Sequence, residues 1–82
     1  MVYNTRVPNV EIKRCALWVD LRREAVRLRD ELQSTLRVTA RISWGGFKEL
    51  TVLVDGRPVF SRRQAGRVPR PGEIARIVQS LG

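Results

Sequence analysis

The sequence lacks histidine altogether and contains only one cysteine, Cys15. A single cysteine cannot form a disulfide within the chain, and without histidine a structural zinc ion would have almost no ligands. Acid–base catalysis by histidine, including triad chemistry, is excluded for the same reason. We therefore predict no metal site, and any redox chemistry has to run through one thiol.

Long apolar runs are also missing. No uncharged run approaches the roughly 20 residues that cross a bilayer, and the first residues lack the apolar segment of a signal peptide, so we expect a cytosolic location. The 82 residues suffice for one small domain. We expect a flexible leader at 1–9, where Pro8 suits an extended lead-in, followed by a single domain at 10–82.

Acidic residues are scarce: eight Asp and Glu stand against sixteen Lys and Arg, which gives a net charge of +8. This charge favours acidic partners or nucleic acid, although a solvated basic face is the plainer alternative. Arg62, Arg63 and Arg67 lie in the arginine-rich C-terminal third. We take them as candidate binding residues for an acidic protein or for glutathione carboxylates. Nonspecific nucleic-acid binding is less favoured, because aromatic residues do not interleave with the arginines.

The first half of the chain shows a strand, a helix and a second strand. Val10–Arg14 and Arg37–Trp44 alternate apolar and polar residues, as strands with one wet face do. Between them, apolar residues recur every three or four positions, which predicts a helix with one apolar stripe. The stripe consists of Leu17, Leu21, Ala25, Leu28, Leu32 and Leu36. A strand–helix–strand unit of this length predicts two parallel strands.

The second half predicts a hairpin and a closing helix. Glu49–Val54 and Val59–Ser61 flank Asp55-Gly56, a strong hairpin signal. A basic loop at Arg62–Gly72 then leads to apolar residues at helical spacing, namely Ile74, Ile77, Val78 and Leu81. The resulting order βαβββα, with one sheet face wet, predicts a two-layer α/β sandwich: a four-stranded mixed sheet with two helices on one face.

Cys15 stands where the first strand gives way to the helix. Free backbone N–H groups and the helix dipole favour negative charge at such a position, and Arg14 adds a neighbouring cation. Both effects lower a thiol pKa and raise the thiolate fraction, so Cys15 is the candidate reactive thiol, with Arg14 stabilising the thiolate. The alternative is that Cys15 serves as a small buried apolar residue.

The arrangement of these motifs resembles the selenoprotein W-like Rdx family. The matching stretches are VEIKRC before the helix, ELQSTL at its end, the Gly45-Gly46-Phe47 turn, and VLVDGRPVFSRRQAGRVP from Val52 to Pro69. The resemblance covers nearly the whole chain from Val10 onward. It implies a compact thioredoxin-like βαβββα fold and a thiol redox-related function.

One departure from the family pattern bears directly on function. The family carries a second cysteine or a selenocysteine three residues after the first, and here that position is Trp18. Dithiol–disulfide chemistry within one chain is therefore impossible, and enzymatic activity is uncertain. Cys15 could still form a mixed disulfide with glutathione or with a partner protein. The alternative is a redox-inactive relative that keeps the fold for protein binding.

The resemblance also implies which residues surround the thiol. In thioredoxin-like folds the turn before the third strand faces the cysteine turn, so Trp44, Gly45, Gly46 and Phe47 should lie near Cys15, together with Trp18. Glycine at this turn lets a partner's backbone approach closely. An apolar rim around a central thiol suits a protein docking surface. Alternatively, the tryptophans simply close one end of a small core.

Overall fold

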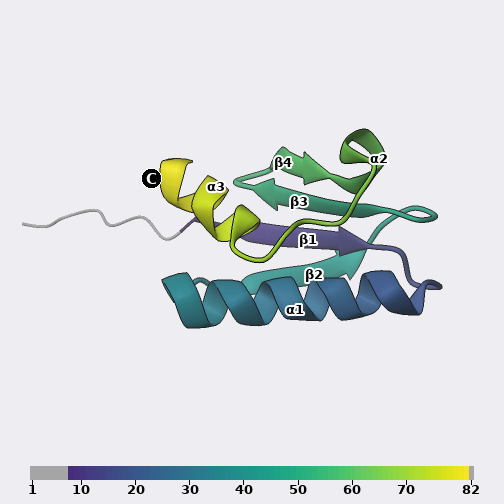
Figure 1. Cartoon of the computed structure of the whole chain (residues 1–82), viewed down its shortest axis with the longest axis horizontal. Helices are drawn as coiled ribbons and strands as arrows, with labels where there is room; N and C mark the ends of the chain where they lie inside the picture. The colour runs from purple at the N-terminus through teal and green to yellow at the C-terminus, as the bar shows by residue number, and fades with distance from the viewer. Residues whose placement is uncertain (1–7, 82) are drawn as a thin grey trace, which may run out of the picture.

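The computed structural model describes residues 8–81, so 1–7 of the expected leader lie outside the described residues (Figure 1). Asn9 is bonded to the hairpin: its N–H donates to Asp55 Oδ1 (3.1 Å) and its carbonyl accepts from the Asp55 N–H (2.8 Å). The elements are β1 (Val10–Arg14), α1 (Val19–Leu36), β2 (Ala40–Trp44), β3 (Leu50–Val54), β4 (Arg57–Ser61), α2 (Arg62–Ala65) and α3 (Glu73–Leu81).

The sheet has the strand order β2-β1-β3-β4. β1 pairs in parallel with β2 and antiparallel with β3, and β3 pairs antiparallel with β4, so the predicted mixed sheet is confirmed. The predicted hairpin turn is confirmed too: Asp55 and Gly56 both have positive φ, 52° and 82°, as the two central residues of a type I′ turn require. Among the described residues, no helix is long and apolar enough to cross a membrane.

The core lies between the sheet and the two long helices, which pack on the same face of the sheet (Figure 1). Val10 and Ile12 point into it from β1 and are fully buried. The apolar stripe of α1 meets them with Leu21, Ala25, Leu28 and Leu32, all buried. On the opposite face, the carboxylate of Glu11 accepts a hydrogen bond from the Ser43 hydroxyl (2.6 Å). The two-layer prediction is therefore confirmed.

α1 begins later than the sequence pattern predicts. Leu17, which the spacing places in the apolar stripe, is 81% exposed and lies before the helix. The physical reason is that the Cys15 N–H donates to the carbonyl of Glu49 (2.8 Å), which holds the chain beside β3 for one residue beyond β1. The chain then turns, and the helix starts at Val19, with Trp18 as an N-cap residue that makes no side-chain capping bond.

The predicted basic loop at 62–72 contains a short helix, α2, that the sequence pattern did not indicate. Ser61 caps it by accepting a hydrogen bond from the Gln64 N–H (3.4 Å), and Gly66 ends it with a φ of 74°. α3 forms as predicted, but Leu81 at its end is 59% exposed, because the last turn extends beyond the core.

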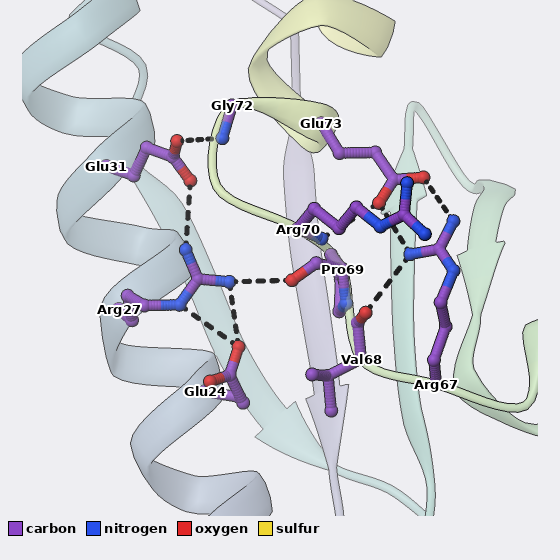
Figure 2. A network of polar contacts seen from close by, with 9 residues as sticks. All are labelled: Glu24, Arg27, Glu31, Arg67, Val68, Pro69, Arg70, Gly72 and Glu73. Carbon is purple, nitrogen blue, oxygen red and sulfur yellow. Dashed lines mark hydrogen bonds and ion pairs between the residues drawn. The ribbon is translucent and has the colours of Figure 1, made fainter.

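The segment before α3 is held against α1 by Arg27 (Figure 2). Arg27 Nη2 donates to the carbonyl of Pro69 (2.9 Å) and to Glu24 Oε1 (2.8 Å), while its Nη1 lies 3.5 Å from Glu31 Oε1. The other oxygen of Glu31 accepts from the Gly72 N–H. One turn of α1 therefore fixes the backbone that leads into the final helix.

A second ion pair folds this segment onto itself (Figure 2). Arg67 donates from Nη1 and Nη2 to the two carboxylate oxygens of Glu73 (2.8 and 2.9 Å), and the Arg70 N–H donates to the same carboxylate (2.9 Å). The Arg67 side chain, followed by the Arg70 N–H, lowers the pKa of Glu73 to about 2. The guanidinium of Arg67 is thus engaged within the fold.

Candidate functional site

Two chain segments meet at the end of the sheet where Cys15 lies. The Cys15 N–H donates to the Glu49 carbonyl (2.8 Å), and the Gly45 N–H donates to the Arg14 carbonyl (2.8 Å). The loop from β1 to α1 and the loop from β2 to β3 are thereby fixed side by side. The expectation that the Gly45-Gly46 turn faces the cysteine turn agrees with this arrangement.

Cys15 is buried, with 2% of its surface exposed, and it is part of the hydrophobic core. Its surroundings are nevertheless polar on one side. The backbone N–H of Lys48 lowers the pKa of the thiol most, followed by the N–H groups of Leu17 and Trp18, and the charge of Arg14 lowers it least. Backbone amides, rather than the predicted cation, are therefore the main source of thiolate stabilisation.

Exposed apolar side chains lie on the two loops that meet at Cys15 and at the end of β2. Trp18 and Phe47, one from each loop, stack with ring centroids 6.3 Å apart and an interplanar angle of 12°. Phe47 is 67% exposed, Trp44 is 69% exposed, and Leu17 is also exposed. The alternative in which the aromatic residues close the end of the core is therefore wrong for Trp44. This end of the sheet presents an exposed apolar patch of the kind found at docking sites.

Cations lie over these rings. Lys48 Nζ is 4.8 Å and Arg62 Cζ is 5.4 Å from the ring centre of Trp18, and Arg14 Cζ is 4.6 Å from that of Trp44. Arginines and aromatic residues do not interleave along the sequence, but folding brings them together from separate segments. The prediction that they would not interleave is therefore wrong for the folded protein. The Trp18 ring stacks on Phe47 and lies beneath two cations, and the Trp44 ring lies beneath Arg14. These cation–π contacts are made within the chain.

The two glycines have a structural role. The Gly46 N–H donates to Glu49 Oε1 (2.6 Å), and a Cβ on Gly45 would lie 2.8 Å from that oxygen. The bond from Gly46 is also the main cause that lowers the pKa of Glu49. Sequence analysis did not single out Glu49. The spacing of an acid three residues after a Gly-Gly turn was its only visible signal.

The three basic residues chosen from the sequence do not form one group. Arg62 lies over Trp18, and Arg63 Nη2 is 3.4 Å from the Phe47 carbonyl, so both belong to the thiol end of the sheet. Arg67 instead pairs with Glu73 near the start of α3. Within residues 8–81, no three Asp, Glu or Cys side chains gather closely enough to hold a metal ion.

Comparison with known proteins rests on structure alone. No family model matches the sequence, and no curated protein matches it. A crystal structure of a selenoprotein W-related protein from Vibrio cholerae superposes with a TM-score of 0.81 over 93% of this chain and 98% of that one, at 20% identity. The chain has the selenoprotein W-related fold. A structure from Bordetella parapertussis matches similarly, with a TM-score of 0.80, 20% identity, and coverage of 94% and 100%. At this identity the likeness establishes the thioredoxin-like βαβββα architecture.

Proposed function

We propose that this protein is a selenoprotein W-like, single-thiol protein that binds a partner protein at the Cys15 end of its sheet, with binding regulated by oxidation of Cys15. The observation that carries the proposal is the combination found at this one place. Backbone N–H groups led by that of Lys48 favour the thiolate, and exposed aromatic side chains lie on the two loops that meet there. A small buried apolar cysteine would need neither feature.

The chemistry is thiol–disulfide exchange. The Cys15 thiolate attacks one sulfur of glutathione disulfide, a bond forms between the two sulfurs, and the other glutathione leaves as a thiolate that takes up a proton. Cys15 is oxidised and the departing glutathione is reduced. Because Trp18 occupies the position three residues after Cys15, the mixed disulfide has no second thiol within the chain. A glutathione molecule or a partner thiol from outside must therefore reverse it, as a reducing cytosol would provide.

Because Cys15 is buried, thiol–disulfide exchange at its sulfur would change the apolar patch that the covering loops carry. With 2% of the residue exposed, a glutathione molecule cannot be joined to the sulfur unless the covering loops move. Those loops carry Trp18 and Phe47, whose stacked rings belong to the apolar patch. Oxidation would therefore rearrange the patch and change its affinity for a protein partner, which is the regulatory part of the proposal.

The test is the alkylation rate of Cys15 with iodoacetamide in the native protein, measured against pH, with the guanidinium-unfolded protein as the reference. We expect native alkylation with an inflection below the ordinary thiol value of about 8.5. We also expect glutathione disulfide to change tryptophan fluorescence in the native protein, and Cys15→Ser to abolish that change. A thiol that reacts only after unfolding would refute the redox role.

That negative result would favour the alternative drawn from the sequence, a redox-inactive interaction module with a basic surface. Two variants distinguish the redox-regulated protein from the redox-inactive interaction module. An interaction module keeps its partner after Cys15→Ser and loses it when the arginines beside the patch, Arg62 and Arg63, become alanine. Their positions over Trp18 and at the Phe47 carbonyl make them part of the same surface.

A further inference from the structure

A groove runs between α1 and β2, beside the Cys15 site. Its helical wall is one face of α1, formed by side chains three or four positions apart: Val19, Arg22, Arg23, Val26 and Arg29. Ile42 of β2 and Arg14 of β1 form the other wall. Two of the apolar residues are well exposed, Val19 at 51% and Val26 at 39%. The groove therefore combines apolar surface with a high density of guanidinium groups.

Part of the positive charge in this groove is uncompensated. Arg22 and Arg23 make no ion pair among the described residues, whereas Arg27 is held by Glu24 and Glu31, and Arg29 lies 3.4 Å from Asp30. Arg14 lies over the Trp44 ring. Arg14 Nη1 is buried and finds no hydrogen-bond partner in the part of the chain that the structure describes. A buried guanidinium nitrogen without a partner is costly, and an incoming carboxylate would satisfy it.

The groove borders an open strand edge. Among the strands that the structure describes, β2 is the outermost, and it pairs only with β1. The Gly45 N–H donates to the Arg14 carbonyl, so Ser43 and Arg41, which lie two and four residues before Gly45, also point their backbone groups toward β1. The alternation of a strand then directs the N–H and C=O of Ile42 and Trp44 away from the sheet. Such an edge can accept one further strand.

We propose that this groove binds an extended acidic peptide of a partner protein, which pairs with the free edge of β2. Its carboxylates would meet Arg14, Arg22 and Arg23, and its apolar side chains would cover Val19 and Val26. Charge complementarity selects this occupant. A second copy of the chain would bring the same positive groove and a net charge of +8. Nucleic acid would satisfy the arginines but would use neither the valines nor the strand edge.

The test uses a fluorescein-labelled peptide of eight alternating Glu and Val residues, followed by fluorescence anisotropy. We expect binding that the double variant Arg22→Glu/Arg23→Glu weakens about tenfold or more. The matched control, Arg57→Glu/Arg76→Glu, changes the net charge equally at two exposed positions outside the groove and should change affinity less than about twofold. A Lys/Val peptide of the same length should not bind.

Amide hydrogen exchange locates the peptide backbone. Strand pairing should slow exchange at Ile42 and Trp44, whose N–H groups point away from β1, and leave Arg41 and Ser43 unchanged, because their N–H groups point toward β1. The proposal fails if the Glu/Val peptide does not bind, or if the control variant weakens binding equally. It also fails if Ile42 and Trp44 gain no protection, or if single-stranded DNA binds the groove more tightly than the peptide. The assay contains no oxidant, so its failure leaves the proposal for Cys15 untouched.

Discussion

Replacing Arg27 with methionine removes the side chain that fastens the segment before α3 to α1. The guanidinium donates to the Pro69 carbonyl and pairs with Glu24 and Glu31 (Figure 2). Methionine has a similar helix propensity and keeps an apolar stem of comparable length. The change therefore isolates the polar contacts of this side chain.

The expected loss can be worked out from these contacts. The hydrogen bond from a charged donor to Pro69 is worth about 1.5 kcal/mol, the low end of its range, because the Arg27 side chain is 34% exposed. The two helical ion pairs add about 0.3 to 0.5 kcal/mol each. The sum is about 2 kcal/mol. For a domain of this size, that corresponds to a fall in melting temperature of roughly 8 to 16 °C.

The assay is thermal unfolding followed by far-UV circular dichroism, with Arg29→Met as the control. Arg29 lies on the same helix and its replacement removes the same charge, but its only polar side-chain contact within residues 8–81 is with its exposed neighbour Asp30 at 3.4 Å. The control should stay within about 0.5 kcal/mol of the native protein. Equal melting temperatures for the two variants would refute the idea that Arg27 holds this segment in place.

Two further predictions concern carboxylates. Because the folded-state pKa of Glu73 is lowered to about 2, its pairing with Arg67 stabilises the fold above the ordinary carboxyl value of about 4.5 and is lost as pH falls toward 2. Glu73→Gln should cost about 1 kcal/mol at pH 7, after allowance for solvent screening, and progressively less below pH 4 in urea unfolding. A pH-independent cost would contradict this. Gly45→Ala should displace the Glu49 carboxylate from the Gly46 N–H and lower the free energy of unfolding by about 1 to 2 kcal/mol. Gly46→Ala should lower it less, because its Cβ would lie 3.3 Å from Glu49 Oε1. Urea unfolding of both variants measures the difference.

Sequence by itself determined the order and type of the main elements. The alternation in Val10–Arg14 and the three-to-four spacing from Leu21 to Leu32 are local periodicities, and each dictates which face of an element is apolar. Asp55-Gly56 predicted the hairpin turn, because few residue pairs tolerate two successive positive φ angles. The position of Cys15 at the end of β1 followed from the same local pattern.

Tertiary structure alone decided what surrounds the thiol. The N–H of Lys48 reaches Cys15 only because β1 is bonded to both β2 and β3, which places the 45–49 loop beside the 15–18 loop. The exposure of Leu17 and the groove between α1 and β2 likewise depend on where the helix starts and which strand lies at the sheet edge. These features arise from contacts between residues distant in sequence, and a periodicity read along the chain contains no information about such contacts.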